Sequence, residues 1–221
     1  MKRVTLFAGH YGSGKTNVAV NYALHLKELG LPVVIADLDV VNPYFRTTDS
    51  EDELKAHDIP LISSDYAGSN VDFPALPGSL YSLFDNQSSY AVLDIGGDDC
   101  GAFALGRYRD MMLSEDNYDM FLVINCYRPL TKTPELCLEI KEEIEEAAGI
   151  KFTGIVNNSN LGSETTWDDV EASLSYAEKV SALCNLPIVM TTVMVGLEDR
   201  DIGCDNIFRI KLQKKIFEED S

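Results

Sequence analysis

The sequence has 221 residues, of which 45% are hydrophobic and 24% are charged. These values are ordinary for a globular protein and exclude an intrinsically disordered or collagen-like chain. The formal net charge of −18 would repel a phosphate backbone over most of the surface, which argues against nonspecific binding to nucleic acid. We expect one folded domain over residues 1–221, with an irregular insertion around residues 65–89.

The five cysteines are odd in number, far apart and never spaced as Cys-x-x-Cys, so neither a disulfide framework nor a zinc site is indicated. The apolar stretch after Met1, Lys2 and Arg3 is too short for a secretory signal, and no stretch approaches the length of a membrane span. We therefore expect a cytoplasmic protein with reduced thiols and without a membrane partner.

In chain order, short β-branched runs alternate with longer segments of helical period. Strands are expected over residues 4–8, 32–37, 91–95, 120–126, 152–157 and 188–193, and helices over residues 15–29, 48–56, 100–113, 134–148, 167–184 and 205–217. Thr133 before Pro134, and Thr166 three residues before Asp169, are N-terminal capping patterns. The alternation predicts a three-layer, Rossmann-like α/β fold with a mostly parallel sheet.

A glycine-rich loop lies between the first expected strand and the first expected helix. Its sequence, Gly9-His-Tyr-Gly-Ser-Gly-Lys-Thr16, matches the phosphate-binding pattern G-x-x-x-x-G-K-[ST] at every fixed position. In such a loop the backbone N–H groups face phosphate oxygens, the lysine reaches the β- and γ-phosphates, and the last hydroxyl ligates Mg²⁺. The expected fold is therefore that of a P-loop NTPase, with Lys15 as a catalytic residue and Thr16 as a metal ligand. The nucleotide-binding residues predicted here are Gly9, Tyr11, Gly12, Ser13, Gly14, Lys15, Thr16 and Asn17.

Two further strands are expected to end in aspartates. After the third strand, Asp94 would hold Mg²⁺ through water, and the N–H of Gly97 would meet the γ-phosphate. After the second strand, Asp39 is predicted to orient or deprotonate attacking water and to lie near the metal, with Asp37 as its support. An Asx turn leading into residues 42–43 is the alternative interpretation of this pair.

The expected strand 152–157 is followed by asparagines. Asn157 and Asn158 stand at the carboxyl end of a strand, where α/β sheets bind ligands, and an amide offers the donor and the acceptor that suit the edge of adenine. We therefore predict that they bind the base. The sequence also lacks Asn-Lys-x-Asp, the pattern of Ras-type guanine recognition, and this absence favours ATP over GTP.

The P-loop, the Asp-x-Asp after the second strand, the Asp-x-x-Gly after the third and the late strand ending in asparagine resemble the CobQ/CobB/MinD/ParA group of P-loop proteins, which is related to the nitrogenase iron protein. The resemblance spans nearly the whole chain, and the chain looks like a bacterial branch of that group. It implies a Rossmann-like parallel sheet, binding of Mg-ATP, slow hydrolysis and, in many members, a homodimer.

One position departs from that group. MinD and ParA carry a signature lysine directly after the first P-loop glycine, and this position is His10 here. A mostly neutral histidine is not a cation of equal reach, so stimulation of a partner's nucleotide through that lysine is not expected. Arg46, Arg107 or Arg109 could supply a replacement charge, or they are surface cations. The amphipathic segment 205–217 is interpreted as a last helix docked on the sheet, with the membrane helix of MinD as the alternative.

The leading hypothesis is a slow Mg-ATP hydrolase that acts as a nucleotide-dependent switch and recruits an unknown protein partner. The alternative is an ATP-dependent synthetase or kinase that transfers the γ-phosphoryl group to a small acceptor, in a pocket lined by Asn42, Tyr44, Arg46 and the 65–89 segment. A third possibility is a nucleotide-binding module with negligible turnover. ATP or ADP and Mg²⁺ are the expected cofactors.

Overall fold

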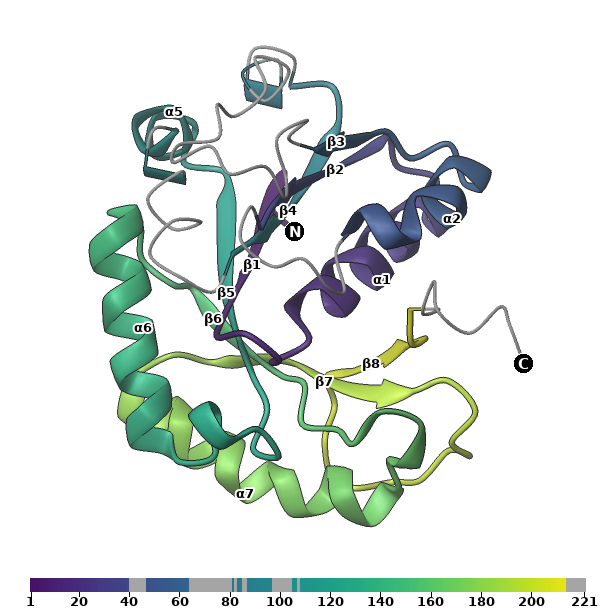
Figure 1. Ribbon diagram of the computed structural model, residues 1–221, viewed down its shortest axis with the longest axis vertical. Coiled ribbons are helices and arrows are strands. Elements are labelled where there is room, and N and C mark those ends of the chain that lie inside the picture. Colours follow the sequence, from purple (N-terminus) through teal and green to yellow (C-terminus); the bar gives the residue numbers. More distant parts are fainter. Residues whose placement is uncertain are drawn as a thin grey trace, which may run out of the picture.

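The computed structural model describes residues 1–39, 47–63, 81, 83–84, 87–96, 105–106 and 108–213. These residues form one eight-stranded sheet in the order β3-β2-β4-β1-β5-β6-β7-β8, and every pair of neighbouring strands is parallel (Figure 1). The strands are β1 (Val4–Ala8), β2 (Val33–Leu38), β3 (Leu61–Ser63), β4 (Tyr90–Ile95), β5 (Tyr118–Ile124), β6 (Gly154–Asn157), β7 (Ile188–Met194) and β8 (Ile207–Ile210).

Helices cover both faces of this sheet, which confirms the predicted three-layer α/β fold (Figure 1). Successive strand residues point to opposite faces, so each face has its own core. Phe7, Ile35 and Val92 pack with α1, whereas their strand neighbours pack with the helices of the other face. The helices are α1 (Lys15–Glu28), α2 (Glu51–Ala56), α5 (Arg109–Glu115), α6 (Pro134–Ala148) and α7 (Trp167–Cys184), with 3-10 turns η1 (Thr47–Ser50), η2 (Pro129–Thr131) and η3 (Gly162–Glu164).

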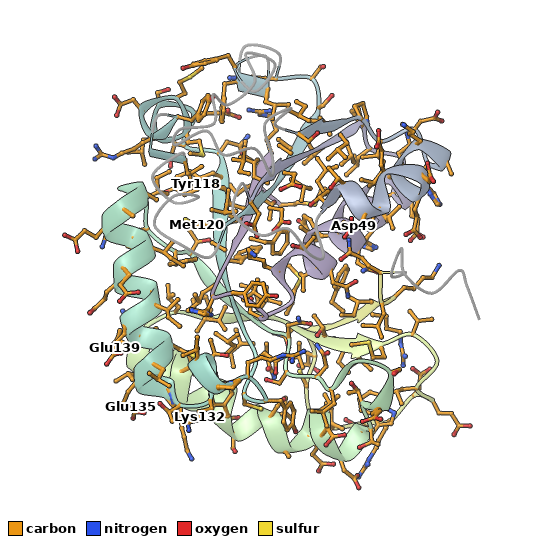
Figure 2. All side chains as sticks on the ribbon, in the orientation of Figure 1. Asp49, Tyr118, Met120, Lys132, Glu135 and Glu139 are labelled. Atoms are coloured by element: carbon orange, nitrogen blue, oxygen red, sulfur yellow. The ribbon has the colours of Figure 1, made fainter. Side chains whose placement is uncertain are left out.

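Helix α6 shows how the sequence fixes the ends and the faces of these helices. The side chain of Thr133 accepts a hydrogen bond from the Leu136 N–H, and Gly149 ends the helix in the left-handed conformation. The inner side buries Cys137, Ile140 and Ile144. Lys132, Glu135 and Glu139 lie exposed along the outer side and at the start of the helix (Figure 2).

Most of the predicted elements are found with small shifts at their ends. The bounds predicted for β1, α6 and α7 are confirmed at both ends, and Thr166 and Asp169 form the expected capping box of α7. The predicted helix 48–56 begins as η1 and continues as α2. Helix α5 covers the last part of the predicted helix 100–113, whose residues 100–104 and 107 lie outside the described residues. Strand β3 was not predicted, because three residues carry no clear period.

The predicted helix over residues 205–217 is wrong for its described part, which contains the edge strand β8. The run Ile207 to Ile210 is rich in β-branched and aromatic residues, and it pairs in register with Thr191 to Met194 of β7. Phe208 makes edge-on ring contacts with Tyr22 and His25 of α1. Pairing with β7 and packing on α1 therefore override the helical period of the isolated sequence. Residues 214–217 lie outside the described part of the chain.

The segment around residues 65–89 is described only near its end. Leu83 and Phe84 are buried in the core, and the ring of Phe84 stacks on Tyr108 with the centroids 5.8 Å apart. This end of the predicted insertion is therefore part of the core. Residues 64–80, 82 and 85–86 lie outside the described part.

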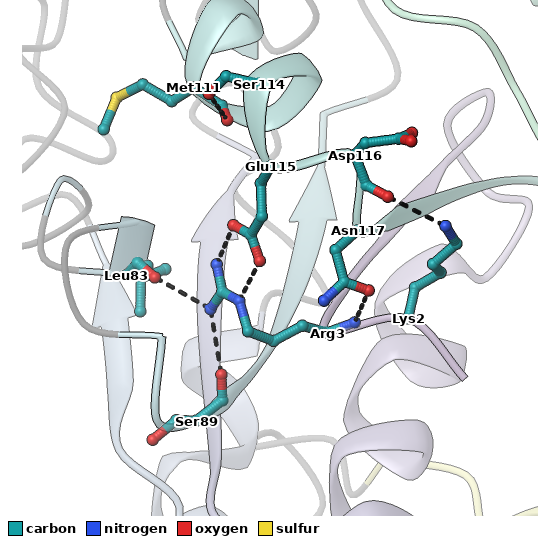
Figure 3. A network of polar contacts seen from close by, with 9 residues as sticks. All are labelled: Lys2, Arg3, Leu83, Ser89, Met111, Ser114, Glu115, Asp116 and Asn117. Atoms are coloured by element: carbon teal, nitrogen blue, oxygen red, sulfur yellow. Dashed lines mark hydrogen bonds and ion pairs between the residues drawn. The ribbon is translucent and has the colours of Figure 1, made fainter.

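A buried ion pair lies at the amino end of the sheet (Figure 3). The Arg3 guanidinium donates to both carboxylate oxygens of Glu115 at the end of α5. It also donates to the carbonyl oxygens of Leu83 and Ser89, at 3.0 and 3.1 Å. One arginine thus joins β1, α5 and the chain that leads into β4.

The described cysteines are Cys126, Cys137, Cys184 and Cys204, and none of these four forms a disulfide. Within the described ranges, none of the helices combines the length and the apolar character that crossing a membrane would need.

Candidate functional site

The loop of residues 9–14 connects β1 to α1, and its conformation requires glycine at two positions. A Cβ on Gly9 would lie 2.5 Å from the carbonyl oxygen of Val123, so only glycine allows this approach of the loop to β5. Gly14 has φ +83°, a left-handed conformation that side chains disfavour. Helix α1 starts directly after Gly14 with no side-chain cap and no acidic residue in its first turn. Its N-terminal N–H groups therefore suit an anion.

Asn158, after β6, anchors this loop from behind. Its Nδ2 donates to the carbonyl oxygen of Ser13 at 2.7 Å, and its Oδ1 accepts from Thr192 Oγ1 at 2.6 Å and from Asn160 Nδ2 at 3.1 Å. The side chain is buried, and a Cβ on Gly14 would lie 2.3 Å from its Nδ2. The amide oxygen thus accepts two bonds and the amide nitrogen donates one within the protein. The geometry therefore favours an anchoring role for Asn158 over recognition of a base.

Lys15 lies at the start of α1 with its ammonium among carboxylates. Its Nζ donates to Asp39 Oδ2 at 2.7 Å, and both side chains are buried. Burial favours the neutral amine, but the pKa of this lysine is raised because the carboxylates of Asp94, Asp39 and Asp37 favour the charged form. The P-loop lysine is therefore a cation at neutral pH. An ammonium has three donors, so Lys15 can contact a phosphate oxygen while it keeps Asp39.

Asp37 and Asp94 are neighbours across the paired strands β2 and β4. Each stands two residues after a strand residue that packs with α1, so both carboxylates point to the α1 face. Asp37 Oδ1 accepts a hydrogen bond from the Asp39 N–H at 3.0 Å. This bond forms an Asx turn at the end of β2, whereas residues 42–43, into which the alternative interpretation leads, lie outside the described residues. The turn places Asp39 against Lys15.

Asp94 is fully buried at the end of β4. Its Oδ2 accepts from Thr47 Oγ1 at 3.0 Å, and its Oδ1 has no hydrogen-bond partner among the described residues. Burial raises the pKa of Asp94, although Lys15 and the hydroxyls of Thr16 and Thr47 act in the opposite direction. An unpartnered buried carboxylate oxygen beside the P-loop is the kind of atom that a cation or its bound water would satisfy.

The oxygen set around Asp94 fits the Mg²⁺ that a P-loop implies. The hydroxyl of Thr16 and the carboxylate of Asp94 are hard oxygen donors, which Mg²⁺ prefers together with water and phosphate oxygens. No group of three His, Cys, Asp or Glu side chains in the described ranges has the arrangement of a protein-only metal site. Mg²⁺ is typically held with substrate phosphates and not by an all-protein cage, so this finding is compatible with the prediction.

The remaining predicted residues are only partly described by the structure. Asn17 is on the first turn of α1, and its Oδ1 accepts from the Gln213 N–H at 2.9 Å. Asn157 is buried and donates to Ser173 Oγ of α7 at 2.9 Å. Tyr11 is exposed at the tip of the loop. Gly97 lies outside the described residues, as do Asn42, Tyr44, Arg46 and Arg107.

An arginine that the sequence analysis did not single out lies near the P-loop. Arg109 donates to the carbonyl oxygen of Gly149 at the last turn of α6. The first turn of α6 follows β5 at the carboxyl end of the sheet, so its last turn, and Arg109 with it, lies away from that end. Arg128, directly after β5, brings its Cδ within 3.9 Å of the Cβ position of Gly12. Thr47 was also missed, because a threonine in a short turn gives no signal until the fold brings it to Asp94.

Comparisons with protein-family models and with curated proteins found no match. Among solved structures, the chain is similar to FtsY from Mycoplasma mycoides, with 19% identity over 87% of this chain and 61% of that one and a TM-score of 0.58. FtsY from Thermotoga maritima gives 18% identity, 86% and 61% coverage and a TM-score of 0.61. The signal recognition particle receptor FtsY from Elizabethkingia anophelis, in complex with GDP, gives 16% identity, 87% and 58% coverage and a TM-score of 0.54.

The chain therefore spans about three fifths of the length of these structures. At such low identity the likeness establishes the fold alone. Fold and loop together define the architecture of a P-loop NTPase: a parallel α/β sheet with a phosphate-binding loop between β1 and α1. The finer resemblance to the CobQ/CobB/MinD/ParA group stays a prediction.

Proposed function

We propose that this chain binds Mg-ATP in the loop of residues 9–16, hydrolyses it slowly and acts as a nucleotide-dependent switch for a protein partner. The observation that carries the proposal is the buried contact between Lys15 and Asp39 beside Asp94. A positive charge is held at the N-terminus of α1, where phosphate oxygens would meet both the ammonium and the N–H groups of the first helical turn.

In such a site each residue around the loop would have its own role. Lys15 would hold the β- and γ-phosphate oxygens, and Asp39 would fix the ammonium and orient the attacking water. Thr16 and Asp94 would hold Mg²⁺, which when bound neutralises charge on the phosphate oxygens. Asn158 would keep the loop in its binding conformation through Ser13.

Adenine is the proposed base because the sequence lacks Asn-Lys-x-Asp. The FtsY structure with bound GDP shows that the same fold also accepts a guanine nucleotide in another protein. Titration of the chain with Mg-ATP and with Mg-GTP therefore tests the base directly. Equal or tighter binding of Mg-GTP would reject adenine and leave the phosphate site intact.

Lys15→Ala tests the phosphate site itself. We expect its affinity for Mg-ATP to fall at least about tenfold, since the change removes a charge-assisted contact worth about 1.5–3 kcal/mol. Lys27→Ala is the matched control, because it removes the same charge from the last turn of the same helix. Unchanged binding by Lys15→Ala in a calorimetric titration would reject the assignment. Release of phosphate in a single turnover without an acceptor separates a hydrolase from a phosphoryl transferase and from an inert binding module.

A further inference from the structure

The chain that follows β8 is tied to the outer side of α1. The N–H of Lys211 donates to Asn21 Oδ1 at 2.8 Å, and Asn21 Nδ2 donates to the carbonyl oxygen of Lys211 at 2.9 Å. One asparagine side chain therefore bonds both backbone groups of the same residue, as a neighbouring strand would. Together with the ring contacts of Phe208, this fixes residues 208–211 on α1.

Two residues further on, Gln213 joins two elements of the nucleotide site. Its N–H donates to Asn17 Oδ1 at 2.9 Å, directly after the metal-side hydroxyl of Thr16. Its Nε2 donates to Ser50 Oγ at 2.8 Å, at the last residue of η1. Both bonds come from one residue, so Gln213 sets the distance between the first turn of α1 and the end of η1.

The other end of η1 is attached to the metal-side carboxylate. Thr47, its first residue, donates to Asp94 Oδ2 at 3.0 Å, and Thr47, Ser50 and Asp94 are all buried. Thr47 and Ser50 are three residues apart, about one turn of a 3-10 helix, so a shift of Ser50 reaches Thr47 through few backbone bonds. The position of Thr47 on Asp94 therefore depends on how Ser50 is held.

We propose that Gln213 is a positioning residue for the Mg²⁺ side of the site, acting through Ser50 and Thr47 on the carboxylate of Asp94. The inference rests on the proposed function, because it assigns Asp94 to the metal. The segment of residues 211–213 is then a strap, and a partner that displaced this strap from α1 would weaken the metal side while leaving the P-loop in place. By thermodynamic linkage, bound Mg-ATP must hold the strap more firmly.

The test measures how much Mg²⁺ strengthens ATP binding, as the ratio of the ATP dissociation constants in EDTA and in excess Mg²⁺. In Gln213→Ala we expect this ratio to fall about three- to tenfold, the scale of one net hydrogen bond, with metal-free ATP binding changed less than about twofold. Ser50→Ala should give the same loss, and the double variant should lose little more than either single one. Leu212→Ala is the control, because it trims an exposed neighbour and leaves Gln213 in place.

The strap would be overturned if Gln213→Ala had the same ratio of ATP dissociation constants as the parent. It would also be overturned if the losses of the two single variants added in the double variant. Either result would leave the P-loop proposal intact. A parent chain that binds no ATP, or binds it equally well without Mg²⁺, would overturn the proposed function and the strap together. Ser50→Ala approaches the same contact from the other side if Gln213→Ala does not fold. Hydrogen exchange of the Lys211 and Gln213 amides should also slow when Mg-ATP is added, and unchanged exchange would contradict the linkage.

Discussion

Lys15 is the residue on which the charge balance of the site depends. Asp37 and Asp94 are cross-strand neighbours with buried side chains, and two carboxylates at that spacing repel each other in a medium of low dielectric constant. The ammonium of Lys15 lies with Asp39 on the same side and offsets this repulsion. A cation at the metal position would act in the same direction, so the site is arranged to gain from binding Mg²⁺.

Asp39 has two proposed roles, to hold the ammonium of Lys15 and to orient the attacking water. Asp39→Asn separates them. The Asn Oδ1 can still accept the hydrogen bond from Lys15, so Mg-ATP affinity should change less than about threefold. Hydrolysis should slow about a hundredfold or more, as expected when a base or a water-orienting group is lost. Equilibrium titration and single-turnover phosphate release measure the two quantities. Equal hydrolysis rates in the variant and the parent would limit Asp39 to holding Lys15.

Asp94→Asn has a pH-dependent effect whose sign follows from burial. Burial raises the pKa of Asp94 above its ordinary value of 3.8. As the pH rises above 3.8, the unfolded chain ionises first, so the folded state loses stability until the pH passes the folded pKa. The amide removes this loss. We expect equal Tm values below pH 3.8 and a Tm advantage for the variant that grows toward neutral pH, at about 2–4 °C for each kcal/mol.

The comparison runs between pH 3 and 8 by thermal unfolding without nucleotide. Asp52→Asn, an exposed carboxylate on α2, is the control and should show no comparable trend. A parent that is more stable than Asp94→Asn at neutral pH would mean that attraction to Lys15 outweighs the cost of burial.

At the scale of elements, the junction of the P-loop with β6 depends on Gly14 and Asn158. Gly14→Ala introduces two costs, a left-handed residue with a Cβ and a clash with Asn158 Nδ2. The first is worth about 1–2 kcal/mol, and the second adds to it. In an Asn158→Ala background only the first cost remains, so the two changes should be less destabilising together than the sum of the single ones.

Urea unfolding of the four proteins of this cycle measures the effect. Gly30→Ala is a close control, since Gly30 has φ +77° and nothing within 4 Å of its Cβ position. It should show the left-handed cost alone, with and without Asn158. Additive free energies for Gly14 and Asn158 would mean that the loop shifts away from the amide without cost.

Sequence predicts the elements whose signals are local and misses those that tertiary contacts decide. Helices α6 and α7 begin after Thr133 and Thr166, which cap them by local bonds, and they end before Gly149 and Asn185, which adopt the left-handed conformation. Strand β8 was mistaken for a helix because its partner β7 and its cover α1 are distant in the sequence. The P-loop was found for the same local reason, whereas the bonds of Asn158 and Thr47 exist only once the strands are side by side.

At the scale of the whole molecule, the two ends of the parallel sheet have different tasks. The carboxyl ends of β1, β2, β4 and β6 carry the P-loop, the carboxylates and the asparagine anchor. The amino end carries the Arg3–Glu115 pair, whose side chains are only 8% and 9% exposed. Changes at the amino end should therefore alter stability and leave the nucleotide site unchanged.

Arg3→Ala tests this division. It leaves the Glu115 carboxylate buried without its cation and removes the donors to Leu83 and Ser89. Breaking a buried pair from one side costs about 3–5 kcal/mol, which is the loss we expect in the free energy of unfolding. Under conditions where both proteins stay folded, Mg-ATP affinity should change less than about twofold.

Two controls decide what that loss means. Lys2→Ala removes a charge one residue away that donates to the Asp116 carbonyl oxygen at an exposed position, and should cost less than about 1 kcal/mol. Arg3→Met combined with Glu115→Leu removes both charges and should recover most of the stability, since apolar side chains of similar size replace buried ion pairs at little cost. A double variant as unstable as Arg3→Ala would place the loss in the bonds to Leu83 and Ser89. A large drop in Mg-ATP affinity in any folded variant would show instead that the two ends of the sheet are coupled.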